Sequence, residues 1–285
     1  MFNPFDLLKI KELFSLKEWW EDRVYGKNKE LRALARRVLK VLDAHNIPTA
    51  RVPWLFPELN LTLKDFKNLD SVIAILNEPF LEAFSNKFFI DRSWLDTGEG
   101  NPQEQFEHGY DFKNIFDYLV NLKPTENQVI VAHFIAQTGT EFVPAEDHGT
   151  HQGLVVALEF AEYDEPNSSF CYSRYQLLYV GYWHYYKTRM MIKAISLLCF
   201  QLGLIQKGYF SKYANYQGVE KYMVAEIFDH LGHKSWYPDD YIFKSEVSAC
   251  SKDRNDALRF HNHLKEIGFY EQIKSLKSTP FFSEP

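Results

Sequence analysis

The densest group of potential metal ligands in this 285-residue chain lies in one short polar segment, EFVPAEDHGTHQG. It contains Glu141, His148 and His151, and neutral imidazole and carboxylate groups both bind divalent metals well. The two histidines are three residues apart rather than the four of an HExxH helix, and the segment is predicted to be a loop between strands. Two interpretations stay open, a metal site and a polar loop that holds no metal.

A second group combines aromatic rings with arginines in the segment FCYSRYQLLYVGYWHYYKTR, residues 170–189. Aromatic faces hold small organic molecules and a guanidinium binds an anion, so these side chains could line a ligand pocket. The candidate ligand-binding residues are Tyr172, Arg174, Trp183, Tyr186 and Arg189. The alternative is that the rings fill a core and that the two arginines pair with Glu159 or Glu162.

Several common enzyme motifs are missing from the sequence. It has no GxxxxGK[ST] phosphate loop, no GxGxxG turn, no GxSxG nucleophile elbow and no HExxH zinc motif. Cys199 lies in an apolar segment where no base is identified for it, which favours a buried structural cysteine. We therefore expect no cofactor, and these absences favour a protein that is not an enzyme.

The spacing of apolar residues indicates two kinds of architecture along the chain. In the first hundred residues it predicts only helices, the clearest over 7–25, 29–44, 63–69, 78–89 and 92–95. Later runs rich in β-branched and aromatic residues predict three antiparallel strands over 128–136, 153–160 and 170–180. Helices are expected over 111–122, 183–202, 219–231 and 254–276, with a strand near 241–247.

The predicted fold class is therefore α+β, with an all-helical domain over residues 1–98 and an α+β domain with an antiparallel sheet and long helices over 111–285. The polar, glycine-bearing segment TGEGNPQEQFEHGY, residues 97–110, is the expected linker.

Charge and aromatic content divide the chain at the same place. Of the 17 tyrosines, 16 follow residue 100. Residues 1–100 hold 15 basic and 15 acidic side chains, so the net charge of −6 comes from the rest of the chain. A neutral domain can still carry a local basic face, whereas an acidic domain is repelled by phosphate.

The cellular location follows from cysteine usage and from the lack of targeting patterns. The three cysteines are widely spaced and form no CxxC pair, so we expect no disulfide framework. The sequence MFNPFDLLKIKELF does not read as a signal peptide, and no window of about 18 residues is uninterruptedly apolar. We expect a cytoplasmic protein that does not bind a membrane.

The segment FLEAFSNKFFIDRSWLDTGEG, at the end of the first domain, has the residue types of a closing helix and cap. The inward helix positions, the aliphatic residue, the cap and the closing turn correspond to Leu81, Phe84, Ser85, Phe88, Ile90, Asp91, Trp94, Leu95 and Gly98. This pattern resembles the final helices of lambda-repressor-like (Xre-type) helix-turn-helix domains, over about residues 29–99. The middle departs from the family, because Pro53 and Pro57 shorten the second helix and the usual Ala-x-x-x-Gly turn is missing.

The resemblance implies a homodimer that binds double-stranded DNA with two-fold symmetry. Thr62–Leu69 would then be the recognition element, with Asn68 reaching an adenine edge and the lysines reaching phosphate or guanine. The residues expected to contact DNA are Arg51, Thr62, Lys64, Lys67 and Asn68.

The sequence thus favours a bacterial or phage-type transcriptional regulator whose second domain senses a small-molecule effector or dimerises. Two alternatives remain. One is a metal-dependent enzyme that uses the 141–151 loop, and the other is a protein-interaction module whose helix-turn-helix no longer binds DNA.

Overall fold

The structure is a computed structural model that describes residues 29–104, 112–125, 127–140, 142, 152–163, 170–238, 240 and 251–277. The chain divides into two compact units. Unit 1 comprises Met1–Asn86 and Arg92–Glu99, and unit 2 comprises Lys87–Asp91 and the chain from Gly100 onward. The predicted helix over 7–25 and the predicted strand near 241–247 lie outside the described residues.

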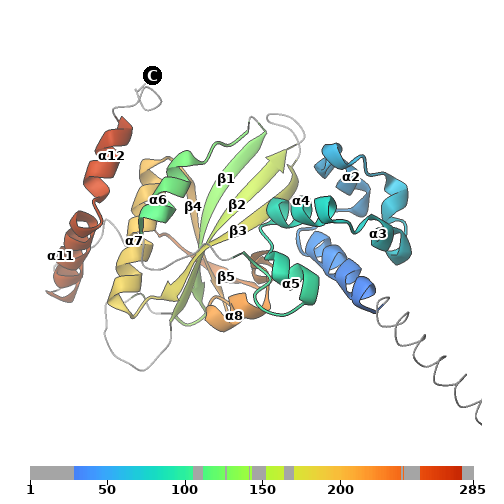
Figure 1. The fold of residues 1–285 in the computed structure, drawn as a ribbon. Helices are drawn as coiled ribbons and strands as arrows, with labels where there is room; N and C mark the ends of the chain where they lie inside the picture. The colour runs from blue at the N-terminus through green and yellow to red at the C-terminus, as the bar shows by residue number, and fades with distance from the viewer. Residues whose placement is uncertain are drawn as a thin grey trace, which may run out of the picture. The chain divides into compact units, whose positions relative to one another are not determined.

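Every regular element in the described part of unit 1 is helical (Figure 1). A helix over residues 29–44 comes first. It is followed by η1 (Thr49–Arg51), α2 (Val52–Leu55), η2 (Pro57–Leu59), η3 (Leu63–Phe66), α3 (Leu69–Ile75), α4 (Glu78–Phe88) and α5 (Arg92–Thr97), where η marks a 3₁₀ helix. Between residues 49 and 66 no element exceeds four residues, because Pro53 and Pro57 each remove a backbone donor.

Unit 1 is held together by an aromatic core and by arginines that join its helices. The rings of Phe56, Phe80 and Phe84 pack with centroid distances of 5.5 to 6.1 Å. Arg37 donates from Nε and Nη2 to the carbonyls of Leu95 and Asp96, both at 2.6 Å, and so ties the helix over 29–44 to the end of α5.

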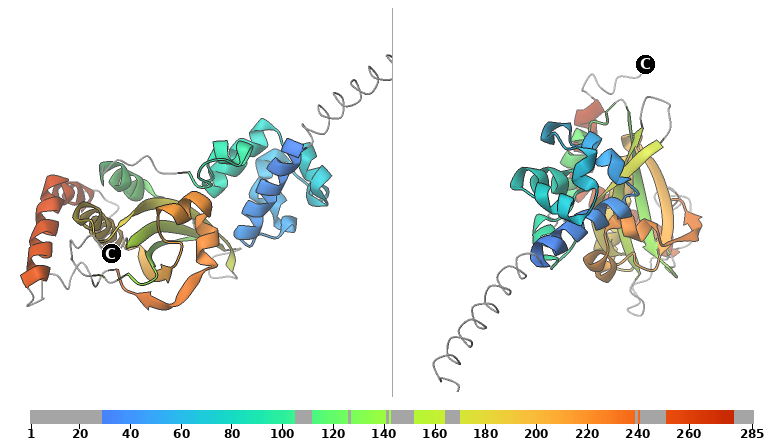
Figure 2. Two further views of the ribbon diagram at one scale, coloured as in Figure 1. Left: turned by 90° about the horizontal axis from the view of Figure 1, so that it is seen from below. Right: turned by 90° about the vertical axis from the view of Figure 1, so that its right-hand side faces the viewer.

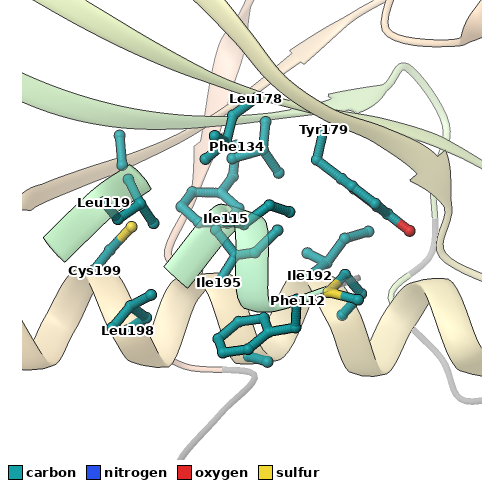
Figure 3. Close-up of a cluster of buried hydrophobic side chains, with 14 of the residues drawn as sticks. Phe112, Ile115, Leu119, Phe134, Leu178, Tyr179, Ile192, Ile195, Leu198 and Cys199 are labelled. Atoms are coloured by element: carbon teal, nitrogen blue, oxygen red, sulfur yellow. The ribbon is translucent and has the colours of Figure 1, made fainter. Parts of the chain in front are cut away.

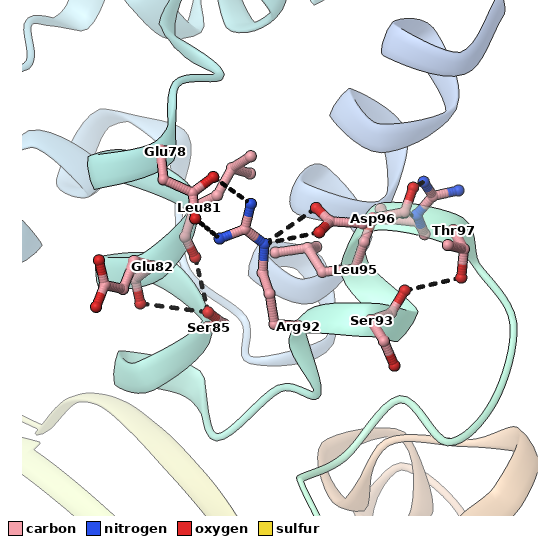
Figure 4. A network of polar contacts seen from close by, with 10 residues as sticks. Glu78, Leu81, Glu82, Ser85, Arg92, Ser93, Leu95, Asp96 and Thr97 are labelled. Carbon is pink, nitrogen blue, oxygen red and sulfur yellow. Dashed lines mark hydrogen bonds and ion pairs between the residues drawn. The ribbon is translucent and has the colours of Figure 1, made fainter.

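Arg92 links the start of α5 to the start of α4 (Figure 4). Its two terminal nitrogens donate to the two carboxylate oxygens of Glu78, each at 2.8 Å, while its Nε donates to Asp96 at 3.0 Å. The Glu78 side chain is 73% exposed, so this contact adds little to stability.

Unit 2 is built on one five-stranded sheet in the order β3-β2-β1-β4-β5. Its elements are α6 (Phe112–Asn121), β1 (Gln128–Gln137), β2 (Gly153–Tyr163), β3 (Phe170–Tyr182), α7 (Tyr186–Gln201), β4 (Ile205–Ser211), α8 (Tyr216–Lys221), α9 (Val224–Phe228), β5 (Leu231–Trp236), α11 (Ser251–Glu266) and α12 (Phe269–Lys277). The α+β class is confirmed, and β1, β2 and β3 pair antiparallel as predicted.

The sheet as a whole is mixed rather than antiparallel. After β3, α7 carries the chain back across the sheet, so β4 lies beside β1 and runs parallel to it. The predicted helix over 219–231 is in fact α8, α9 and the start of β5, which pairs antiparallel with β4. The helix is interrupted between α8 and α9, where the backbone of Tyr222 is extended.

Helices lie on both faces of this sheet (Figure 2), and a cluster of buried apolar side chains packs on each face. On one face Phe134 and Leu178 pack against α6 and α7, which contribute Phe112, Ile195 and Leu198 (Figure 3). Cys199 belongs to this layer, and complete burial raises the pKa of its thiol to about 12, which confirms a buried cysteine. On the other face Ile135 and Leu177 pack against α8 and α9.

Gln103 shows that part of the predicted linker is a structural element of unit 2. Its side chain is 2% exposed, and its Nε2 donates to the carbonyls of Phe89 at 3.1 Å and Tyr175 at 3.0 Å. Its Oε1 accepts from the backbone N–H of Val224 at 2.9 Å. One amide therefore joins three segments that are far apart in the sequence.

We expect Gln103→Ala to lower the free energy of unfolding by about 2–3 kcal/mol, because it removes the hydrogen-bond partner of one buried and two partly buried backbone groups. Urea unfolding of the full chain measures the loss. The matched control is Glu104→Ala at the neighbouring exposed position. Equal midpoints for the two variants would contradict the role given to Gln103.

Candidate functional site

The cations expected to contact DNA lie on short elements of unit 1 that contact one another. Arg51 ends η1, Lys64 lies in η3, and η1 contacts η3. Lys67 follows η3 as its C-cap. All three side chains are exposed, so folding gathers cations that the proline-containing segment separates in the sequence. We call the surface formed by Arg51, Lys64 and Lys67 the basic surface.

The prediction of a single helix over 63–69 is wrong. η3 ends at Phe66, and α3 begins at Leu69. The backbone of Asn68, between them, is extended, so the two helices do not continue one another. Asn68 Oδ1 accepts from the backbone N–H of Ser71 at 2.9 Å, so this residue is the N-cap of α3.

Thr62 also makes hydrogen bonds to a residue close to it in the sequence. Its backbone N and its Oγ1 donate to Asp65 Oδ2 at 2.7 and 2.9 Å. The Asp65 carboxylate thus accepts from both the backbone and the hydroxyl of Thr62 at the start of η3. Two of the five residues predicted to contact DNA therefore stabilise the local turns on either side of Lys64 and Lys67.

Cations outnumber acids by one in the segment that carries the basic surface. Residues 49–68 contain three cations and two acids, Glu58 and Asp65, and Asp65 accepts from Thr62. The next acid along the chain, Asp70, pairs with Arg32 at 2.7 Å. Lys64 and Lys67 are exposed and make no ion pair with the described residues. The lysine charges are thus presented to solvent.

The five residues predicted to line a ligand pocket do not converge on one site. Tyr172 and Arg174 lie near the start of β3, whereas Trp183, Tyr186 and Arg189 follow its end. A strand rises about 3.3 Å per residue, so Arg174 and Trp183 are separated by about 30 Å along β3. The structure therefore does not bring these five residues together at one site.

Arg174 instead takes part in an ion pair within unit 2. Its Nη2 donates to Glu162 Oε1 at 2.6 Å and its Nη1 to the carbonyl of Lys87 at 3.1 Å. The guanidinium also lies 5.4 Å from the ring centroid of Phe160. The alternative in which Arg174 pairs with Glu162 is confirmed.

Trp183 and Arg189 belong to the core beside α7. Arg189 is 1% exposed and donates to the carbonyls of Trp183 at 2.8 Å and His184 at 3.2 Å, just before the helix begins. One turn further, Lys193 is also buried, and its Nζ lies 5.9 Å from the Trp183 ring. Tyr186, at the first position of α7, is exposed.

The predicted metal ligands Glu141, His148 and His151 lie outside the described residues, so a metal site there stays a prediction. In the part of the chain that the structure describes, no three His, Cys, Asp or Glu side chains are grouped so that they could hold a metal ion.

The sequence analysis missed a buried polar cluster on the sheet face that α9 covers. Nε2 of His133 in β1 donates to Glu159 Oε2 in β2 at 2.7 Å, and the hydroxyl of Ser173 in β3 donates to the other oxygen of the same carboxylate. Phe228 of α9 packs its ring edge-on to the imidazole at 4.6 Å. We call His133, Glu159 and Ser173 the sheet cluster.

The electrostatics of the sheet cluster favour a neutral histidine beside a charged carboxylate. Burial lowers the pKa of His133, and Glu159 only partly offsets this effect. Burial would raise the pKa of Glu159, but the hydrogen bonds from His133 and Ser173 outweigh it and hold that pKa below the usual range. His133 Nδ1 is buried and has no hydrogen-bond partner among the described residues, so a proton there would have no acceptor.

The geometry of the sheet cluster is not that of a nucleophilic triad. In such a triad the imidazole accepts the proton of the hydroxyl. Here the hydroxyl and the imidazole both donate to Glu159, so His133 does not activate Ser173. The cluster links the side chains of three neighbouring strands through one carboxylate.

Comparison with family models, with curated proteins and with solved structures found no match to this chain. Among the described helices, none combines the length and the apolar character that crossing a bilayer requires.

Proposed function

We propose that this chain is a DNA-binding transcriptional regulator in which unit 1 contacts double-stranded DNA and unit 2 supplies effector sensing or dimerisation. The observation that carries the proposal is the basic surface, where contacting one-turn elements expose Arg51, Lys64 and Lys67. The resemblance of residues 29–99 to Xre-type domains supports the same function and a homodimeric, cytoplasmic protein.

The charge distribution supports DNA contact by unit 1 rather than by unit 2. The acidic excess of the chain lies after residue 100, where it repels phosphate. Exposed lysines bind phosphates by releasing condensed counterions, and this contribution does not require a long recognition helix.

The caps at Thr62 and Asn68 define what the surface can read. An asparagine recognises adenine with its carbonyl and its amide together, and Asn68 uses Oδ1 to cap α3. We therefore propose that Arg51, Lys64 and Lys67 position the protein on phosphates, and that residues 49–68 discriminate weakly among base sequences.

A mobility-shift assay tests this function. The purified full chain is titrated into a duplex from its own upstream region, at a stated salt concentration, with unrelated duplex as competitor. We expect a shifted complex whose affinity falls as salt rises. A chain that leaves the duplex unshifted at low salt would contradict the proposal.

A further inference from the structure

One side chain next to the basic surface has an exposure that packing does not explain. Trp54 in α2 is 82% exposed, although tryptophan is on average among the more buried residues. Its indole makes no aromatic or cation–π contact with the residues that the structure describes. Tryptophan is enriched among the few side chains that carry most of the binding energy at interfaces.

The backbone beneath Trp54 is firmly held. Val52 and Leu55 of the same turn are buried, at 0% and 6% exposure, and they anchor α2 to the core of unit 1. Pro53 at the start of α2 restricts the backbone further. The indole is therefore presented on a fixed turn, which lowers the entropy lost when a partner binds it.

The charges around Trp54 identify the kind of partner. Arg51 is helical and lies three residues before Trp54, so the two side chains share one face, with their Cβ atoms about 5–6 Å apart. Lys64 comes from η3, which contacts η1. An aromatic ring that shares its helix face with an arginine suits a polyanion that has flat faces, and nucleic acid bases stack on such rings without regard to sequence.

The shape of the surface favours stacking over groove reading. A helix that reads the major groove presents three or four side chains along its length. The elements between residues 49 and 66 are each four residues or shorter, so they offer no such helix. A projecting indole can instead meet a base that has left the stack.

We infer that Trp54 stacks on an unpaired base, so that unit 1 prefers DNA with a locally opened duplex. The inference rests on the proposed DNA binding by unit 1 and adds the kind of site that is bound. Arg51, Lys64 and Lys67 hold the flanking phosphates. Stacking of Trp54 makes binding to opened DNA tighter than binding to fully paired DNA.

Fluorescence anisotropy of two labelled duplexes tests this inference with the full chain. One duplex is fully paired, and the other has the same sequence with a short unpaired stretch at its centre. We expect the wild type to bind the opened duplex about tenfold more tightly. Trp54→Ala should abolish this preference and keep its affinity for the paired duplex, while Trp54→Phe should retain part of the preference.

The control variant is Tyr237→Ala, which removes a 68% exposed aromatic ring from unit 2 and should keep the full preference. Equal wild-type affinity for the two duplexes, or a preference that survives Trp54→Ala, would overturn the inference and leave duplex binding intact. Binding to neither duplex would overturn the proposed function as well. An altered sedimentation coefficient of Trp54→Ala with an unchanged DNA preference would assign the indole to a protein interface and also overturn the inference.

Discussion

Replacement of Arg51, Lys64 and Lys67 together by alanine is expected to weaken duplex DNA binding about 100-fold at moderate salt. Each cation that leaves a phosphate removes one counterion-release contribution, so the slope of log affinity against log salt should flatten by about one unit per residue. The three side chains are exposed, so the fold should tolerate their loss.

The comparison needs a variant with the same change in net charge. Lys187, Lys234 and Lys265 are exposed lysines of unit 2, and their joint replacement by alanine removes the same charge elsewhere. This control should keep the wild-type slope. If both triple variants lost affinity equally, general charge rather than the basic surface would explain binding, and the residue assignment would be wrong.

Glu159→Ala is expected to lower the free energy of unfolding by about 3–5 kcal/mol, which a urea titration at pH 7.5 measures. The carboxylate accepts from both His133 and Ser173, whose side chains are 2% and 4% exposed. Without it, two buried donors lose their acceptor. Glu159→Gln keeps one acceptor oxygen and should cost less. A loss below about 1 kcal/mol in Glu159→Ala would show that the sheet cluster is not a structural support.

From the electrostatics of the sheet cluster we expect the folded protein to be less stable in acid. The pKa of His133 is lowered by burial, so the folded state binds fewer protons than the unfolded chain, and stability falls as the pH drops below about 6.5. Burial raises the pKa of Glu159, but its hydrogen bonds outweigh burial and lower it. Protonation of this carboxylate therefore also reduces the stability of the folded state below about pH 4.5.

His133→Gln should therefore lose less stability than the wild type between pH 7.5 and pH 5.5, as measured by urea midpoints. His233→Gln, at an exposed position in β5, is the control and should keep the wild-type pH dependence. An identical pH dependence in all three proteins would contradict a buried neutral His133.

The parts of the fold that the sequence predicted are those with strong local patterns. The strand over 128–137 has a nearly continuous apolar run that is rich in β-branched residues. The helix over 29–44 repeats apolar residues at helical spacing. β4 was missed because IQKGYFS mixes a lysine, a glutamine and a glycine, and its place beside β1 comes from a crossover rather than from local pattern.

The functional candidates were harder to predict because they depend on register and exposure. His133 and Glu159 are far apart in the sequence and meet only because Val131 pairs with Glu159, two residues from His133 on the same strand face. Tyr172 to Arg189 were predicted as one group because they are close in sequence, but an extended strand separates them. The sequence analysis did not single out Trp54, since apolar periodicity does not give exposure.

The salt dependence of duplex binding by the wild-type full chain tests the central claim most directly. Affinity for a duplex from its own upstream region would be measured between about 50 and 200 mM salt. A basic surface that contacts three phosphates predicts a log–log slope of about −3 or steeper, flattened by about three units when Arg51, Lys64 and Lys67 are removed. No binding at the lowest salt, or a slope that the triple variant leaves unchanged, would contradict DNA binding through this surface.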